Sequence, residues 1–108
     1  MHPLKLAVAL PLAGMTMLAT AGNIPTPPPQ VGLCAACHGR DGVARRADTP
    51  NLAGQRYDYL RKAMNAYRSG RREVPLMRAA LGPLSTAQLD TLARWYAAQR
   101  PVCRKSGS

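Results

Sequence analysis

The sequence has no phenylalanine, only five acidic residues against fifteen lysines and arginines, and only two histidines in 108 residues. Without phenylalanine or rows of β-branched residues, and with ten prolines and nine glycines, extended β-sheets are not expected. The histidines are His2 and His38, and His2 lies in a segment that we expect to be removed. A single remaining histidine excludes the paired histidines of a metalloprotease, and a Ser-His-Asp site would have to use His38 itself.

Residues 1–21 have the composition of an export signal. The cation Lys5 precedes an apolar run from Leu6 to Leu18, and the small residues Ala-Thr-Ala, which end at Ala21, form a cleavage pattern. The apolar run is broken by proline and glycine and is too short for a comfortable membrane span. Cleavage after Ala21 would place the protein in the periplasm. It would leave 87 residues with a net charge of +9 instead of +10, because Lys5 is lost.

The rest of the chain is expected to hold one small domain. Residues 22–29 contain the run NIPTPPP and form a stiff proline-rich leader, residues 30–101 form the domain, and residues 102–108 form a polar tail. A domain of this size buries a modest share of its surface, so a disulfide, metal or cofactor is often needed to stabilise it.

Hydrophobic spacing predicts an all-α domain with three helices and long loops. The helices are expected from about Pro29 to His38, from Tyr57 to Ser69 and from Ser85 to Pro101. The loops are expected at residues 39–54 and 71–83, the second with one turn around Met77 to Leu81. Gly70 stands where the second helix needs a C-terminal cap, and Ser85 with Gln88 forms a capping box for the third. Loops this long in so small a domain indicate that something besides the chain fills the core.

The sequence Cys34-Ala35-Ala36-Cys37-His38 has the C-x-x-C-H spacing of c-type haem attachment. On a helix, Cys34 and Cys37 lie on one face, so both thiols can form thioethers with the two vinyl groups of one porphyrin. His38 follows directly and aims its imidazole at the iron from the same side. The motif predicts one covalently attached haem c per chain, with His38 as the proximal axial ligand of the iron.

Three other uses of these residues are weaker. A thioredoxin-like site would need a strand before the motif. A zinc site could use Cys34, Cys37, His38 and Cys103, but adjacent Cys37 and His38 rarely bind one tetrahedral ion together. A disulfide between Cys34 and Cys37 stays open, because export leads to an oxidising compartment. Cys103 follows the last helix; we expect it outside the haem site, where it can pair between chains or remain a free thiol.

The second axial position of the iron needs a ligand other than His38. Met64 lies on the apolar stripe of the second helix, which favours an ordinary role in the core. Met77 is expected in a loop just after Pro75, where its sulfur is free to face a metal. We therefore predict Met77 as the distal axial ligand, with Met64, a lysine or a vacant position as the alternatives.

With these motifs in order, the segment from Val31 to Arg100 resembles a class I cytochrome c of the small bacterial type similar to cytochromes c4 and c553. The resembling segments are CAACHG at 34–39, DG at 41–42, PNLAGQ at 50–55, YL at 59–60, YRSGRR at 67–72, Met77, LS at 84–85 and WY at 95–96. The resemblance implies an all-α class I cytochrome c fold, with three to four short helices and long loops wrapped around one covalently bound haem.

The resemblance also implies contacts around the haem. The carbonyl of Pro50 would accept a hydrogen bond from the other ring nitrogen of His38, which would fix the ring and raise its basicity. Five residues would form the core around the porphyrin: Tyr59, Leu60, Tyr67, Leu89 and Leu92.

The prolines before the first helix are a departure from the family pattern. They shorten that helix, so its crossing with Trp95 and Tyr96 of the last helix would be small and would run through Gly32 and Leu33.

With His38 and Met77 as ligands, both axial positions would be closed to substrates, and the sequence offers no nucleophile, acid–base pair or nucleotide-binding loop. The expected function is electron transfer by an exported monohaem cytochrome that is not an enzyme. Two alternatives stay open: a cytochrome subunit of a dehydrogenase or oxidase complex, and a ligand-binding or peroxidatic haem protein in which Met77 dissociates.

The positive charge predicts acidic redox protein partners or a membrane-bound oxidase or dehydrogenase, and it permits contact with an anionic membrane surface. The cations are expected to ring the exposed haem edge on two loops: Arg40, Arg45, Arg46, Arg71, Arg72 and Arg78. The resemblance leaves open an approach of Gln55, Arg71 and Arg72 to the haem propionates, and a solvated basic loop is the favoured interpretation of the two arginines. Nucleic-acid binding is not predicted, because no motif or alternation of aromatic and basic residues supports it.

Overall fold

A computed structural model describes residues 2–5, 7–14 and 26–102. In these residues the chain forms four helices and no strands: α1 (Val31–His38), α2 (Tyr57–Ser69), α3 (Pro75–Leu81) and α4 (Thr86–Ala97). The predicted all-α fold class is confirmed. No helix in this part of the chain is long and apolar enough to cross a membrane. The expected cleavage site after Ala21, residues 22–25 of the leader, and Cys103 with the rest of the tail lie outside the described residues.

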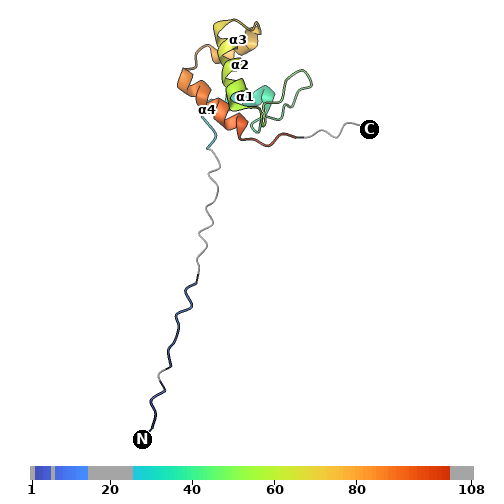
Figure 1. Cartoon of the computed structure of the whole chain (residues 1–108). Helices are drawn as coiled ribbons and strands as arrows, with labels where there is room; N and C mark the ends of the chain where they lie inside the picture. Colours follow the sequence, from blue (N-terminus) through green and yellow to red (C-terminus); the bar gives the residue numbers. More distant parts are fainter. Residues whose placement is uncertain (1, 6, 15–25, 103–108) are drawn as a thin grey trace, which may run out of the picture.

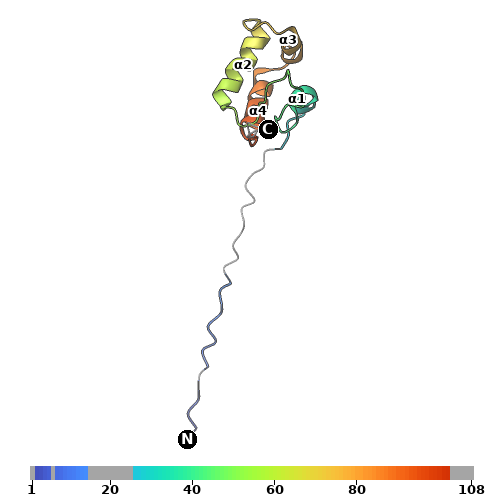
Figure 2. The ribbon, with the colours of Figure 1, turned by 90° about the vertical axis from the view of Figure 1, so that its right-hand side faces the viewer.

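Helix α2 is the central element of the domain. It packs against α4 and against α3 (Figure 1). Figure 2, a quarter turn away, shows α1 and α3 on the same side of α2, with α3 near the end at Ser69 and α1 nearer the end at Tyr57. The helix that carries the C-x-x-C-H motif and the helix that carries Met77 therefore share one side of α2.

The core lies where α1, α2 and α4 meet. Leu92 and Ala93 of α4 are fully buried, and they pack in one cluster with Leu60 of α2 and Val31 of α1. Each buried leucine stabilises the fold by about 1.5–3 kcal/mol relative to an exposed one. Trp95 and Tyr96 belong to the same cluster.

The predicted crossing of the first and last helices through Gly32 and Leu33 is wrong. Gly32 is exposed, and Leu33 is 59% exposed. The backbone N–H of Val31 donates to the Pro28 carbonyl at 3.0 Å, so the helix begins at Val31. Residues three apart share a helix face, so Cys34 and not Gly32 or Leu33 lies on the side of Val31 that meets the core.

The segment 71–83 also differs from the prediction, because residues 75–81 form helix α3 instead of one turn in a loop. Pro75 occupies the first turn, where its fixed φ suits a helix, and the N–H of Arg78 donates to the Val74 carbonyl at 3.0 Å. Leu81, only 2% exposed, anchors the other end. A helix this short depends on tertiary packing rather than on propensity, so the local sequence did not predict it.

The two predicted helix-end signals are confirmed. Gly70 ends α2 in the left-handed conformation with a φ of 80°, and its N–H donates to the Tyr67 carbonyl. At the start of α4, the Gln88 N–H donates to Ser85 Oγ at 3.1 Å, and the Ser85 N–H donates to Gln88 Oε1 at 2.9 Å. Gly70 thus fixes where α2 ends, and Ser85 with Gln88 fixes where α4 begins. Both helices form the frame around the candidate site.

Candidate functional site

The C-x-x-C-H motif occupies the last turn and a half of α1. Cys34 and Cys37 are three residues apart and therefore lie on one face of α1. Both side chains are half-buried, and neither forms a disulfide. The Cys34 thiol donates to the Gln30 carbonyl at 3.7 Å. Burial raises the pKa of Cys34, so at neutral pH this side chain is a thiol, the form whose S–H can add across a vinyl group.

His38, at the end of α1, is only 8% exposed, and its ring orientation is set by the backbone of another segment. Its Nδ1 lies 2.9 Å from the Pro50 carbonyl oxygen. A carbonyl oxygen only accepts hydrogen bonds, so Nδ1 carries the proton, and Nε2 of the neutral ring keeps an unshared electron pair. Nε2 has no hydrogen-bond partner among the described residues, which leaves it available to a metal ion.

The loop between α1 and α2 brings Pro50 back to His38. Gly42 adopts a φ of 77°, and its carbonyl accepts hydrogen bonds from the N–H groups of Leu52 at 2.8 Å and Ala53 at 3.0 Å. Asn51 Oδ1 accepts a further bond from the Ala44 N–H at 2.7 Å. These bonds join residues 42–44 to residues 51–53, which directly follow Pro50, and so they hold the Pro50 carbonyl at the imidazole.

Two aromatic residues of α4 hold the chain directly after the motif. The Tyr96 hydroxyl donates to the Gly39 carbonyl at 3.1 Å, and Trp95 Nε1 donates to the Arg40 carbonyl at 2.8 Å. Burial of the Tyr96 ring raises the pKa of its hydroxyl, which therefore stays protonated and donates at neutral pH. The last helix thus fixes the position of His38 through the backbone that follows it.

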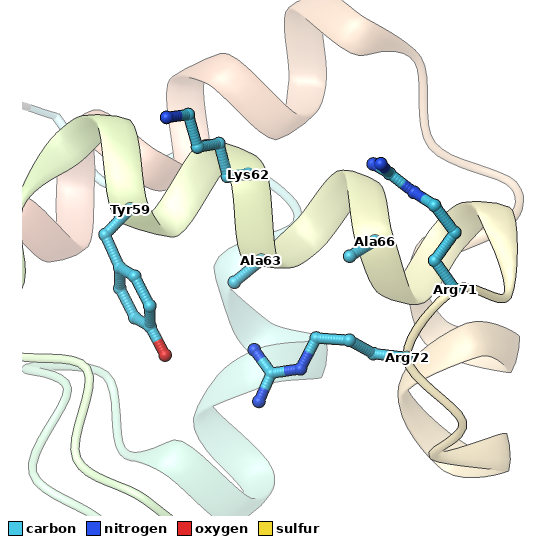
Figure 3. Close-up of a pocket in the computed structure, with 6 residues that line it drawn as sticks. All are labelled: Tyr59, Lys62, Ala63, Ala66, Arg71 and Arg72. Carbon is cyan, nitrogen blue, oxygen red and sulfur yellow. The ribbon is translucent and has the colours of Figure 1, made fainter.

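An open surface cavity of about 550 Å³ lies along α2. Ala63 and Ala66 form its floor, with Tyr59 at one end and Arg72 at the other, and Figure 3 shows the tyrosine and the arginine extending on the same side of α2. Lys62 and Arg71 complete the lining.

The side chains expected around the haem lie in different surroundings. Leu60, Leu89 and Leu92 are buried, whereas Tyr59 is 51% exposed and lines the cavity. The guanidinium carbon of Arg72 lies 4.5 Å from the centre of the Tyr67 ring. Arg72 is thus an exposed residue of the loop, as interpreted from the sequence, and it also makes a cation–π contact with Tyr67.

The two candidate methionines lie in different surroundings. Met64 is half-buried on α2 and packs against the core cluster of Leu60 and Leu92, which agrees with an ordinary packing role. Met77 lies in the first turn of α3, not in a loop, and is also half-buried. A thioether on the first turn of a short helix is held in place by the fold, and α3 lies on the same side of α2 as α1.

Two alternative uses of the motif find no support in the described residues, which contain no strand for a thioredoxin-like unit and no disulfide between Cys34 and Cys37. The zinc alternative includes Cys103, which lies outside those residues; within them, no group of three or more His, Cys, Asp or Glu side chains could hold a metal ion. Two thiols on one helix face and a histidine with an unshared pair on Nε2 instead fit a covalently attached haem.

Comparisons with known proteins agree with this geometry. The chain is 39% identical over 98 residues to cytochrome c4 of Pseudomonas aeruginosa, a match that covers 89% of this chain and 49% of that protein. It is 35% identical over 82 residues to cytochrome c-554(548) of Halomonas halodenitrificans, with 73% of this chain and 99% of that protein covered. No protein-family model matches the chain.

The name of a further relative states the enzyme from which that relative accepts electrons. The thiosulfate dehydrogenase electron acceptor of Thiomonas intermedia is 31% identical over 100 residues, which cover 92% of this chain and 46% of that protein. The chain spans about half the length of this relative and of the Pseudomonas cytochrome c4.

Proposed function

Because the chain belongs to the c-type cytochromes, which are electron carriers rather than enzymes, we propose that it transfers single electrons through one haem c held on α1. The observation that carries the proposal is the last turn of α1, where two thiols share a face and the next residue, His38, turns Nδ1 to a backbone carbonyl. One C-x-x-C-H motif in the chain supports one haem.

Four residues would hold the haem. Cys34 and Cys37 would form its thioethers, His38 would bind the iron through Nε2 and Met77 would bind it through sulfur from the opposite side. The bound group supplies an iron that alternates between Fe(III) and Fe(II), and a neutral thioether ligand favours Fe(II) and raises the reduction potential.

The residues around these ligands would set their orientation. The Pro50 carbonyl oxygen accepts the Nδ1–H of His38, with 2.9 Å between nitrogen and oxygen, which would keep the ring in one tautomer and make Nε2 a better donor to the metal. Tyr96 and Trp95 keep the backbone after His38 in place and limit reorganisation around the site.

The domain boundaries and destination belong to the same proposal. Residues 1–21 would be a cleaved signal for export to the periplasm, residues 22–29 a leader, residues 30–101 the cytochrome domain and residues 102–108 a tail. The apolar run of the first segment and the Ala-Thr-Ala sequence before residue 22 support the export signal.

The partners would be redox proteins. Two relatives, from Thiomonas intermedia and Stutzerimonas stutzeri, are named as electron acceptors of thiosulfate dehydrogenase, which supports a protein as electron donor. The excess of cations further supports an acidic partner, either a redox protein or a membrane-bound oxidase or dehydrogenase. Because the Debye length falls from ~30 Å at 0.01 M salt to ~10 Å at 0.1 M, electron transfer with such a partner should slow steeply over that range. A rate that does not respond to salt would remove the electrostatic part of the proposal.

The ligand assignment is tested by comparing Met77→Ala with Met64→Ala in the haem-loaded protein. Met77→Ala should abolish the sulfur-to-iron charge-transfer band while the haem stays covalently attached, and Met64→Ala should keep the band. If the band disappears only in Met64→Ala, the distal ligand is Met64. Absence of the band from the parent protein would exclude methionine ligation, and a chain that never attaches haem would refute the proposed function itself.

A further inference from the structure

Residues 70–85 connect α2 to α4 and carry Met77 on α3, in the middle of the connection. We name these residues the Met77 segment. Its helix has seven residues and packs against α2. A helix of two turns has little stability of its own, so the position of Met77 depends on how the two ends of the segment are held.

The first end of the Met77 segment is held by the backbone alone. The Gly70 N–H donates to the Tyr67 carbonyl at 3.2 Å, and the Arg72 N–H donates to the Ala66 carbonyl at 3.1 Å. These two bonds turn the chain back directly after α2, and they need no particular side chain.

The second end is held by one side chain of α2, Arg68. Its Nη1 donates to the Leu84 carbonyl at 3.0 Å. Its Nη2 donates to Asn65 Oδ1 at 2.8 Å and to Thr86 Oγ1 at 3.3 Å. The Leu84 N–H in turn donates to the carbonyl of Leu81, the last residue of α3, at 3.0 Å. The guanidinium therefore joins α2 to the end of α3 and to the first residue of α4.

These bonds close a loop that has Met77 at its centre. Eighteen positions separate Arg68 from Thr86, and Met77 lies midway between them. Closing a loop removes conformational freedom from the residues within it. A bond at the base of the loop thus restricts the thioether in its middle, although Arg68 and Met77 are on different helices.

The arginine is itself ordered before it meets the segment. Asn65 Nδ2 donates to the Arg61 carbonyl at 3.0 Å, which turns Oδ1 of the same amide to Arg68. Arg68 is half-buried, and none of the ion pairs among the described residues includes it. Its charge therefore strengthens bonds to neutral oxygens. A lysine would keep the charge but lose the planar fork that reaches several oxygens at once.

We propose that Arg68 is a positioning residue for Met77: its guanidinium closes the Met77 segment at the base and thereby keeps the thioether at the iron. This assignment rests on the electron-transfer function proposed above, in which Met77 is the distal ligand. Arg68 would act through the Leu84 backbone and α3. Without it, the segment would leave α2 more often, and the distal position would open to small ligands.

The test uses Arg68→Lys in the haem-loaded protein, with Arg61→Lys as the matched control. Arg61 lies two turns earlier on the same helix, and its Nε lies 3.5 Å from Asp90 Oδ1 of α4. It therefore also joins α2 to α4, but outside the Met77 segment. The probe is imidazole, which binds the ferric iron only after the Met77 sulfur has left it. At saturating imidazole the observed rate measures that departure.

Imidazole should bind about tenfold faster to Arg68→Lys than to the parent, because charge-assisted hydrogen bonds are lost. Arg61→Lys should stay within about 1.5-fold of the parent, because its ion pair is partly exposed. Asn65→Ala keeps the guanidinium but removes the amide that orients it, so it should bind imidazole about threefold faster. This third variant decides the matter if Arg68→Lys does not fold.

Two results would overturn the proposal. One is an imidazole rate that is unchanged in Arg68→Lys and in Asn65→Ala. The other is a rate that merely follows the urea midpoint of unfolding across all variants, because Arg68 would then stabilise the whole domain and not the Met77 segment.

Amide hydrogen exchange provides a measurement that does not depend on the iron ligand. The N–H groups of Gly82 and Leu84 are bonded within the Met77 segment, and they should exchange about tenfold faster in Arg68→Lys. The Ala98 N–H, at the end of α4, should not change. Equal exchange in parent and variant would refute the role of Arg68. A parent without the sulfur-to-iron band would instead refute Met77 as the ligand, and the exchange rates alone would then show whether Arg68 holds the segment.

Discussion

Gly42 is a position where one added methyl group should disturb the haem site. Its φ of 77° is a conformation that other residues rarely adopt, and its carbonyl joins the N–H groups of Leu52 and Ala53. A Cβ at this position would lie 2.6 Å from the backbone nitrogen of Ala53 and 2.9 Å from Cδ1 of Tyr96. Neither neighbour can move easily, because the nitrogen is bonded within the loop and the tyrosine ring is buried.

The expected cost of Gly42→Ala has two parts. Holding alanine in a left-handed conformation costs about 1–2 kcal/mol. Forcing an extra methyl group into a filled space costs about 1–3 kcal/mol more. The free energy of unfolding should therefore fall by about 2–5 kcal/mol. Because the same loop carries Pro50, the Nδ1 proton of His38 should also exchange faster with solvent.

Gly32→Ala is the matched control. Gly32 lies inside α1, and nothing stands within 4 Å of the added Cβ. The substitution should therefore raise the free energy of unfolding by about 0.5–1 kcal/mol, since alanine favours a helix. Urea unfolding of the haem-loaded proteins, followed by far-UV circular dichroism and haem absorbance, measures both. A loss smaller than about 1 kcal/mol in Gly42→Ala would show that the loop yields, and would refute the packing argument.

Three other changes test the frame of the domain in the same assay. Leu92→Ala, at a fully buried position, should lower the free energy of unfolding by about 2–5 kcal/mol. Tyr96→Phe should lower it by only about 0.5–1.5 kcal/mol, because the Gly39 carbonyl that loses the hydroxyl still accepts the Gly42 N–H at 3.2 Å. Burial raises the pKa of Tyr96 above its usual 10.0, so above pH 10.0 the unfolded chain loses a proton that the folded chain keeps. The free energy of unfolding should therefore fall as the pH rises above 10.0, and this fall should be smaller in Tyr96→Phe. Ser85→Ala should cost about 1 kcal/mol, and an unchanged urea midpoint would mean that the capping box of α4 contributes nothing.

The sequence by itself determined the features that depend on near neighbours. The spacing of Cys34, Cys37 and His38 within one helical turn predicts haem attachment without any knowledge of the rest of the fold. Gly70 and the Ser85–Gln88 pair predicted helix ends because caps are made by residues within a few positions of one another. The all-α class followed from hydrophobic spacing at the helical period.

Only the tertiary structure decided the features that depend on distant residues. Helix α3 exists because Leu81 is buried by the rest of the domain, and so Met77 lies on a helix instead of in a loop. The approach of Pro50 to His38 spans twelve residues and depends on the turn at Gly42, and the resemblance alone had implied it.

The same distinction explains the misplaced helix crossing and the two groups of arginines. Val31, not Gly32 or Leu33, meets the core because the direction of a short helix is set by what it packs against. Arg46 and Arg72 look alike in the sequence, but one forms an exposed ion pair with Asp48 and the other lies over an aromatic ring at the cavity. Local patterns specify turns and helix periods, whereas the neighbours of a side chain from other elements are decided only when the chain folds back on itself.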